Sequence, residues 1–172
     1  MEGNSVCAHI HGFSPYLYVI APDNFQKSYL PEFKERLDAA IIKDIKSNKD
    51  NVQEAILRVD MVQRQSIQFY TGEEKNNFIK ITVALPKLIA AVKRLLEREI
   101  LMAEVNFQDC RTFESNIDFD IRFMVDTKVV GCSWIELVPN TWTMRAKGKD
   151  PEPESRCQLE IDVAFDKFIA HE

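Results

Sequence analysis

The chain of 172 residues has only five glycines, three histidines and four cysteines, and each scarcity excludes a class of site. The glycines form neither the G-x-x-x-x-G-K-[ST] loop nor the G-x-G-x-x-G loop that cradles phosphate groups. The cysteines include no C-x-x-C pair, so we expect buried free thiols instead of a zinc or iron–sulfur site. They are Cys7, Cys110, Cys132 and Cys157.

Long apolar runs and excess positive charge are also missing. No apolar run approaches the ~20 residues that cross a bilayer, and the N-terminus lacks the charged-then-apolar pattern of a signal peptide. We therefore expect a soluble intracellular protein. With 22 Lys and Arg against 27 Asp and Glu, the net charge is −5. This argues against binding nucleic acid by bulk electrostatics, so any such contact must be local.

Catalytic and metal-binding groups do not converge in the sequence. His9 and His11 share one side of a predicted strand, but no carboxylate or further histidine lies near them, and we predict no metal site. Asp118 and Asp120 are two positions apart on a predicted helix and point to different sides, which is wrong for a shared two-metal site. The D-x-E spacing at residues 150–152 flanks a proline in a polar loop, where we expect solvated carboxylates. We predict no catalytic residue in this chain.

Alternation of apolar and polar residues predicts most strands. The first covers residues 6–13, with Val6, Ala8 and Ile10 on its buried face, and ends at Gly12. Further strands are predicted over residues 16–20, 57–61, 79–83 and 101–107. The strands at residues 57–61 and 79–83 are joined around a turn at Thr71–Gly72. The face of residues 57–61 that we expect to be buried carries Leu57, Val59 and Met61. The chain after residue 129 is again strand-like, interrupted by a polar loop at residues 146–155.

Three amphipathic helices are predicted from apolar stripes at helical spacing. One covers residues 30–45 with Phe33, Leu37 and Ile41 inward, and a second begins at Pro86, which suits the first turn of a helix. The third covers residues 117–126. Its predicted buried stripe is Ile117, Ile121, Met124 and Val125. Gly131 falls inside the strand predicted to follow, which indicates a bulge or a close backbone approach.

The order of these elements predicts an α+β fold. Residues 15–107 give strand, helix, strand, strand, helix, strand, which is the ferredoxin-like order that RNA-recognition modules also use. We therefore predict a ferredoxin-like unit over residues 15–115, a bridging helix over residues 116–126, and a small OB-like antiparallel β-barrel from residues 1–14 and 127–172.

The sheet face away from the helices is a candidate surface for unpaired bases. Aromatic rings and cations on an open sheet can stack on bases and neutralise phosphates. Closure of this face by another domain or by the flanking strands is the alternative, and it is favoured because the aromatic signature of RNA-recognition strands is missing from NFIKITVAL. The side chains expected on it are Arg58, Lys80 and Thr82, with either Tyr16 and Tyr18 or Leu17 and Val19.

Four stretches carry a resemblance to a known family. They are CAHIHGFSPYLYV, ITVALPKLIAAVKRLLE, IDFDIRFMVDT with the VGCSW that follows it, and RCQLEIDV. They resemble the region just before the exonuclease domain in the catalytic subunits of eukaryotic DNA polymerase delta, which are family B replicative polymerases. The resemblance implies a non-catalytic N-terminal domain that braces the exonuclease and palm domains and contacts the single-stranded template. It also implies a nuclear enzyme with accessory subunits and a sliding clamp, whose magnesium and iron–sulfur sites lie in other domains.

Archaeal family B DNA polymerases bind and inspect template bases in a pocket of their N-terminal domain. The resemblance places nucleic-acid-binding roles on Pro15, Tyr16, Pro86, Ile89, Phe119 and Arg122. Asp118 departs from the archaeal pattern, which has proline there. Packing between subdomains is the alternative role for these six residues, and a free-standing RNA-recognition-like module that binds single-stranded nucleic acid is the alternative function.

Overall fold

The computed structural model describes residues 3–46, 52–65, 75–98, 105–107, 110–145 and 155–171. The chain forms two compact units, which we call unit 1 (Met1–Phe13 with Asp118–Glu172) and unit 2 (Ser14–Ile117). Helices and strands occur in both, so the predicted α+β class is confirmed. The predicted turn at Thr71–Gly72, residues 101–104 of a predicted strand, and the loop at residues 146–154 with its D-x-E spacing lie outside the described residues.

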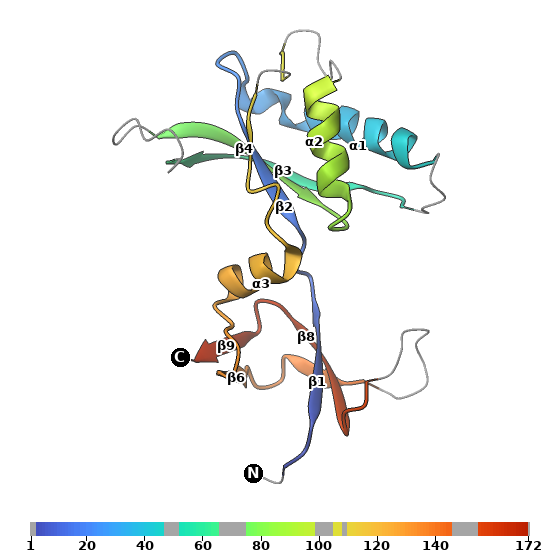
Figure 1. The fold of residues 1–172 in the computed structure, drawn as a ribbon, viewed down its shortest axis with the longest axis vertical. Helices are drawn as coiled ribbons and strands as arrows, with labels where there is room; N and C mark the ends of the chain where they lie inside the picture. Colours follow the sequence, from blue (N-terminus) through green and yellow to red (C-terminus); the bar gives the residue numbers. More distant parts are fainter. Residues whose placement is uncertain are drawn as a thin grey trace. The chain divides into compact units, whose positions relative to one another are not determined.

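In its described residues, unit 2 is a four-stranded sheet with two α-helices and one short 3-10 helix. Its elements are β2 (Tyr16–Ile20), η1 (Lys27–Tyr29), α1 (Leu30–Lys46), β3 (Ile56–Arg64), β4 (Asn76–Val83), α2 (Leu88–Arg98) and β5 (Thr112–Phe113). The strand order is β3-β4-β2-β5, and every neighbouring pair is antiparallel. Both helices lie on the same side of this sheet (Figure 1).

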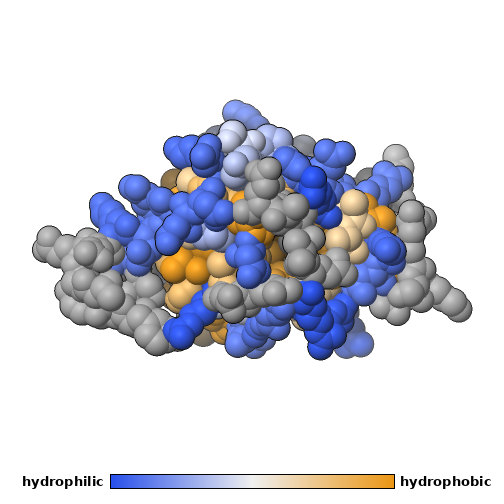
Figure 2. All heavy atoms as spheres, turned by 90° about the horizontal axis from the view of Figure 1, so that it is seen from above, coloured by the Kyte–Doolittle hydropathy of each residue, from blue (hydrophilic) through white to orange (hydrophobic). Residues whose placement is uncertain are grey.

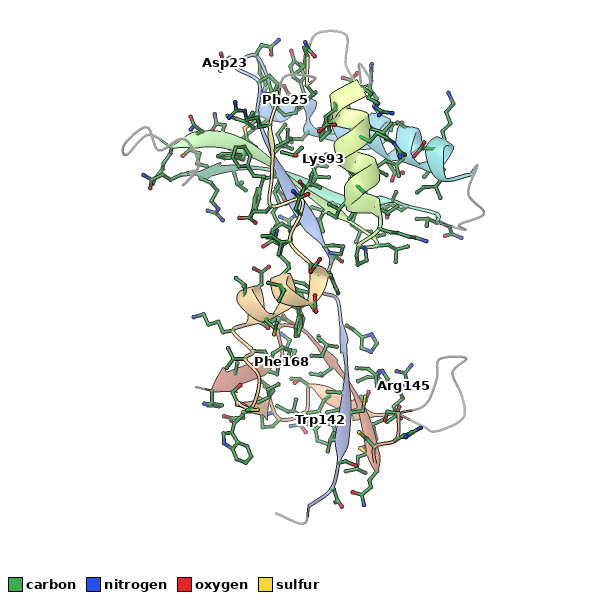
Figure 3. All side chains as sticks on the ribbon, in the orientation of Figure 1. Asp23, Phe25, Lys93, Trp142, Arg145 and Phe168 are labelled. Carbon is green, nitrogen blue, oxygen red and sulfur yellow. The ribbon has the colours of Figure 1, made fainter. Side chains whose placement is uncertain are left out.

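The core of unit 2 fills the space between the helices and the sheet. The predicted stripes are confirmed, because Phe33, Leu37 and Ile41 of α1 are fully buried and the apolar residues of α2 are buried with them. Leu17, Val19, Ile79 and other inward residues of β2 and β4 complete the core. An aromatic cluster closes one end of it. Phe33 stacks on Phe107 with ring centroids 4.8 Å apart, and Phe25, which Figure 3 labels, lies 5.7 Å from both rings.

Two strand predictions in unit 2 are wrong. The register of β3 shifts between Ile56 and Arg58, so Ile56 faces the core and Leu57 is exposed instead. A bulge of this kind inserts one residue and breaks the alternation on which the prediction depended. The fourth strand of the described sheet is β5 at Thr112–Phe113, whereas Phe107, from the described end of the predicted strand, packs in the core on Phe33.

Unit 1 contains one helix and two separate sheets. Its elements are β1 (Val6–His11), α3 (Phe119–Thr127), β6 (Trp134–Leu137), β7 (Trp142–Met144), β8 (Leu159–Ala164) and β9 (Phe168–His171). One sheet has the order β1-β8-β7, and the other pairs β6 with β9. Among the described residues these strands do not close into a barrel, so the predicted OB-like barrel is not confirmed.

The direction of β1 also corrects the prediction of an all-antiparallel arrangement. β1 pairs with β8 in parallel, while β7 pairs with β8 antiparallel. Parallel neighbours need a long connection, and nearly the whole chain separates these two strands. Gly12 ends β1 as predicted, with a φ of 85° that a residue with a Cβ rarely adopts.

α3 turns the opposite face inward from the one predicted. Ile121 and Val125 are exposed, whereas Arg122 is buried and Phe123 is half-buried. The rings of Phe119 and Phe123 pack on Phe13, at 5.5 and 5.3 Å between ring centroids. Phe168, labelled in Figure 3, lies 6.2 Å from Phe123. The helix therefore packs its aromatic rings within unit 1 and leaves Ile117, Ile121 and Val125 of the predicted stripe exposed, while Met124 is half-buried.

Gly131 is not in a strand. It lies in the turn before β6, and a Cβ atom added there would meet nothing within 4 Å, so neither a bulge nor a close approach explains this glycine.

On the face that Figure 2 shows, hydrophobic residues appear between hydrophilic ones. Among the helices of the described ranges, none is both long and apolar enough to cross a membrane.

Candidate nucleic-acid interface

The open face of the unit 2 sheet carries the tyrosines. Leu17 and Val19 are fully buried in the core, so Tyr16 and Tyr18 point to the side away from the helices. The register aligns side chains in rows across the strands. Tyr16 pairs with Thr82, which pairs with Arg58, and Tyr18 pairs with Lys80, which pairs with Asp60. The first of the two predicted sets of side chains is therefore the one on this face.

Rings and charges on this face contact one another. The Nζ atom of Lys80 lies 3.7 Å from the centroid of the Tyr16 ring, a cation–π arrangement. Tyr16 and Tyr18 meet edge to face at 5.5 Å between centroids. Arg58 forms an ion pair with Asp60 at 2.7 Å, so the acid on this face is already matched by a cation. The face can offer aromatic surface and one ammonium group to a ligand.

A pocket of about 510 Å³ lies beside the short edge strand β5. Its apolar residues are Tyr18, Phe78, Phe113 and Ile117. The rings of Phe78 and Phe113 are perpendicular, with centroids 5.3 Å apart. Its polar residues are Arg64, Gln65, Thr112, Glu114, Ser115 and Asn116.

Four of the predicted site residues lie in unit 2. Pro15 is buried, and its carbonyl accepts a hydrogen bond from the N–H of Val83 at 2.9 Å. Pro86 begins the turn into α2, where its carbonyl accepts the N–H of Ile89 at 3.2 Å. Tyr16 is half-buried on the open face. The structure therefore gives Pro15 and Pro86 backbone roles and leaves Tyr16 as the one ring on the open face among these four.

Phe119 and Arg122, the other two predicted site residues, lie in unit 1. Phe119 is 36% exposed, and its ring packs on that of Phe13. Arg122 is only 6% exposed, so its guanidinium is largely shielded from solvent within unit 1. Asp118 is the N-cap of α3 in an extended conformation, and its carbonyl accepts the N–H of Arg122 at 2.9 Å.

A row of histidine–carboxylate pairs joins β1 to β8. The Nε2 atom of His9 lies 3.0 Å from Glu160, and that of His11 lies 2.6 Å from Asp162. A hydrogen bond donated by the Ser155 hydroxyl, followed by the one with His9, lowers the pKa of Glu160 although burial opposes this. The hydrogen bond with His11 lowers the pKa of Asp162, and Arg145 adds to this. Cys7 and His9 are half-buried while Val6 and Ala8 are exposed, so the prediction is wrong at the start of β1, whereas Ile10 is half-buried and His11 exposed as predicted.

No metal centre is formed by the described part of the chain. Within it, no three His, Cys, Asp or Glu side chains come close enough to hold a metal ion. His9 and His11 each engage a carboxylate of β8, which is a structural use of the two histidines.

Sequence reasoning missed most of the pocket beside β5. Phe78, Lys80 and Thr82 are alternate residues of β4 and therefore lie on the same face. Extension of the predicted strand by two residues toward its N-terminus would have assigned Phe78 to the open face. Phe113 gave no such signal, because a strand of two residues is too short to show a period. Arg64 closes a nine-residue strand whose end the alternation did not predict.

Comparison with known proteins identifies two family matches. Residues 12–90 match the family described as DNA polymerase delta catalytic subunit-like, N-terminal domain. Residues 110–172 match the exonuclease domain of family B DNA polymerases. The second match corrects the prediction that the chain lies wholly before that domain, because the homology to it already begins near residue 110.

Similar proteins include DNA polymerase delta catalytic subunits from several organisms. The chain is 56% identical to that of Drosophila melanogaster over 100% of its own length and 16% of the relative. It is 43% identical to that of Bos taurus, over 99% of this chain and 15% of the relative. The chain thus spans about one sixth of the length of these relatives.

The fold is similar to part of a solved structure, that of the family B DNA polymerase from the hyperthermophilic archaeon Pyrobaculum calidifontis. The TM-score is 0.55 at 18% identity, over 93% of this chain and 16% of that one. At this identity the likeness concerns the fold alone. Together with the two family matches and the identity along its whole length, it leads to one assignment: the chain belongs to the family of DNA polymerase delta catalytic subunits and corresponds to the N-terminal region of such a family B DNA polymerase.

Proposed function

We propose that this region is a non-catalytic part of a nuclear replicative DNA polymerase. In this function it braces the exonuclease and palm domains of the same chain and contacts the single-stranded template during replication and repair synthesis. The accessory subunits and the sliding clamp would act on the rest of the polymerase. What supports the proposal is the match to polymerase delta along the whole chain.

In this function the chain itself performs no chemical step. Among the described residues, no three His, Cys, Asp or Glu side chains come close enough to bind a metal ion. The magnesium and iron–sulfur sites of the full-length polymerase are therefore proposed to lie outside these residues. We also infer that unit 2 is ferredoxin-like, because its β-α-β-β-α-β order and its strand order β3-β4-β2-β5 agree with that arrangement.

An exposed apolar ribbon in unit 1 supports the bracing role. β6 and β9 form a two-stranded sheet, in which Trp134 is 66% exposed and Ile135 and Ile169 are also exposed. Phe168 of β9 packs beside Phe123 of α3, while the exposed side chains of the ribbon make no such ring contact within the described residues. Exposed apolar patches of this kind mark interaction sites. The polymerase sequence outside this chain, more than four fifths of the relatives' length, is the proposed partner.

Quenching of Trp134 emission tests the bracing role. In a Trp142→Phe background, the emission of Trp134 is obtained in each protein as the difference from the Trp134→Phe/Trp142→Phe variant, and acrylamide should quench it strongly in the 172-residue chain and several-fold less in the full-length polymerase. Equal quenching in both proteins would show that the ribbon stays in solvent and would remove the support for bracing.

Template contact is proposed for the open face of unit 2, with Tyr16 as its main ring and Pro15, Pro86 and Ile89 in supporting positions. The same proposal assigns Phe119 and Arg122 to the template. Single-strand affinity should fall by about 1 to 3 kcal/mol when a stacking ring is removed. Full-length wild-type and Tyr16→Ala polymerases should be titrated with template overhangs of different length at two salt concentrations. Tyr29→Ala, which removes a half-buried ring packed on Phe25, is the matched control.

Melting curves separate binding from stability in this experiment. A Tyr16→Ala enzyme that melts earlier but binds every overhang as well as wild type would leave Tyr16 a packing residue. An enzyme that melts normally and binds long overhangs more weakly supports the template role.

A further inference from the structure

We propose that the outward face of α1 is a self-association surface, on which a second copy of this chain docks with its own α1 antiparallel to the first. Both helices of unit 2 lie on one side of the sheet (Figure 1), and the open face is the other side. The inference therefore goes beyond the proposed template contact and does not depend on it.

The outward face of α1 is defined by a pocket of about 750 Å³. All the described residues that line this pocket belong to α1, and they recur at spacings of three and four residues from Pro31 to Lys43. This spacing places them together on one side of the helix. The apolar residues among them are Pro31, Ala39 and Ile42, and the charged ones are Lys34, Glu35, Asp38 and Lys43.

Two of the four charged residues are already engaged within unit 2. The Nζ atom of Lys34 forms an ion pair with Glu54 at 2.6 Å. The Oδ1 atom of Asp38 accepts hydrogen bonds from the N–H groups of Ala55 and Ile56, at 2.7 and 2.8 Å. These contacts hold the start of β3 beside α1.

Glu35 and Lys43 remain for an external partner. Both are exposed, and neither forms an ion pair within the described part of the chain. They lie four residues before and four residues after Ala39. At a rise of 1.5 Å per residue, each is about 6 Å from Ala39 along the helix axis, in opposite directions. The face therefore carries one negative and one positive charge placed symmetrically about a small residue.

This charge arrangement is complementary to itself. A two-fold axis at the level of Ala39, perpendicular to α1, places Glu35 of one copy level with Lys43 of the other, and the same contact forms a second time by symmetry. Parallel helices would instead place Glu35 beside Glu35 and Lys43 beside Lys43, and like charges so placed repel each other. Charge complementarity thus selects an antiparallel second copy as the occupant of this face.

The centre of the face allows the two helices to approach closely. Packed helices lie about 8 to 10 Å apart, depending on the side chains at the contact, and the exposed Ala39 presents only a methyl group there. Asp38 is next to the centre, so the two copies of this carboxylate come near each other. The two N–H groups that bind each Asp38 stabilise its negative charge at that place.

The size of the face predicts a weak and reversible dimer. From Pro31 to Lys43 the face is about 18 Å long and about 10 Å wide. Standard stable interfaces bury about 800 Å² on each partner, which is more than such a face provides. Because the ion pairs are exposed, they add little affinity and are screened by salt. Self-association should therefore rise with concentration and fall as salt is added.

A zero-length crosslink in the full-length polymerase tests the contact directly. Carbodiimide joins a carboxylate to an amine that touches it. In an equal mixture of isotopically heavy and light polymerase, mass spectrometry should detect Glu35 of one copy linked to Lys43 of the other. Within one helix these two residues are about 12 Å apart along the axis, too far for a direct link.

Charge reversal, followed by sedimentation velocity over a concentration series, tests the symmetry. Glu35→Lys and Lys43→Glu should each weaken self-association by roughly tenfold or more, because each variant turns two attractions into two repulsions. An equal mixture of the two variants should associate again, since every lysine then meets a glutamate. Glu97→Lys and Arg98→Glu make the same charge changes at exposed positions of α2 and are the matched controls, which should associate like wild type.

Recovery in the mixture also shows that both variants are folded. A wild-type polymerase that stays monomeric throughout the series and forms no Glu35–Lys43 link would overturn the proposal. Single variants that associate like wild type would overturn it as well. Loss of association in the single variants without recovery in their mixture would mean that this face binds a surface other than its own copy.

Discussion

Ile56 and Leu57 are adjacent on β3, and the same truncation should affect them very differently. Ile56 is fully buried in the core, while Leu57 is 40% exposed at the register shift between Ile56 and Arg58. Ile56→Ala removes three carbon atoms from a packed site and leaves a cavity. We expect it to lower the free energy of unfolding of unit 2 by about 2 to 5 kcal/mol.

The expected cost at Leu57 is smaller because solvent already reaches its side chain. Complete burial of a leucine side chain stabilises by roughly 1.5 to 3 kcal/mol. Leu57→Ala removes only part of that apolar area and leaves no closed cavity. We therefore expect about 1 kcal/mol or less. The two isomeric side chains give a matched comparison in which only burial differs.

Urea unfolding of the 172-residue chain measures both variants. Ellipticity at 222 nm reports mainly on unit 2, because the longer helices α1 and α2 belong to it. Both tryptophans, Trp134 and Trp142, belong to unit 1, so their emission provides a separate internal reference. If Leu57→Ala destabilised unit 2 as much as Ile56→Ala, the plain alternation would be correct and the bulge would not exist in solution.

Three further outcomes are expected. Unit 1 should lose stability as the pH falls below the ordinary Glu160 pKa of 4.5, because the folded state lowers the pKa values of Glu160 and Asp162. Both carboxylates contribute their full stabilisation of unit 1 above their unfolded pKa values. Tryptophan emission should report the loss of unit 1 stability at lower pH, and Glu160→Gln should show a much smaller dependence of stability on pH. The 172-residue chain should neither extend a primer nor degrade single-stranded DNA with magnesium present, and nucleotide incorporation by the purified chain would contradict this. Gly131→Ala should change the melting temperature little, because its Cβ would meet no atom, and a drop of several degrees would mean that the turn needs glycine.

Periodicity predicted the elements of unit 2 well where their segments were long. The stripe of α1 repeats over four turns, so no other face could be buried, and Phe33, Leu37 and Ile41 are indeed in the core. The alternation of β4 was equally unambiguous over Ile79, Ile81 and Val83. β5 could not be predicted, because its two residues pair with β2 through the tertiary position of the chain and not through a local pattern.

Unit 1 was predicted less well for a different reason. Its strands are short, and β1 pairs with β8 from the other end of the chain, so the sequence near β1 does not contain its neighbour. Parallel pairing of β1 with β8 could not be predicted from alternation alone, since alternation has no direction. The inward face at the start of β1 was misjudged because Glu160 is buried with His9, and a hydrogen-bonded polar pair can replace an apolar one.

The sequence predicted one part of the candidate template surface, the position of Tyr16, and did not predict the pocket beside β5. Tyr16 lies on the open face, as one of the two alternatives stated, because the neighbouring Leu17 and Val19 are apolar enough to take the core side. The pocket beside β5 is formed by β2, the end of β3, β4 and the segment at residues 112–117, which approach one another only in the folded sheet. A local sequence pattern cannot reveal a site whose walls come from four separate segments.

The buried face of α3 gives the last prediction. Both faces of this helix carry apolar residues, so the stripe of Ile121 and Val125 was as plausible as that of Phe119 and Phe123, and packing on Phe13 decided between them. Arg122 is 6% exposed and has an interaction partner, while Val125 is 70% exposed. Removing one member of a buried charged interaction costs about 3 to 5 kcal/mol, whereas exposed truncations usually change stability by about 0.5 kcal/mol or less. In the 172-residue chain, Arg122→Ala should therefore shift the tryptophan-detected urea midpoint strongly and Val125→Ala hardly at all. Arg122→Lys should recover only part of the loss, because lysine keeps the charge but not the planar fork of donors. A Val125→Ala variant less stable than Arg122→Ala would mean that the aliphatic stripe is the buried one.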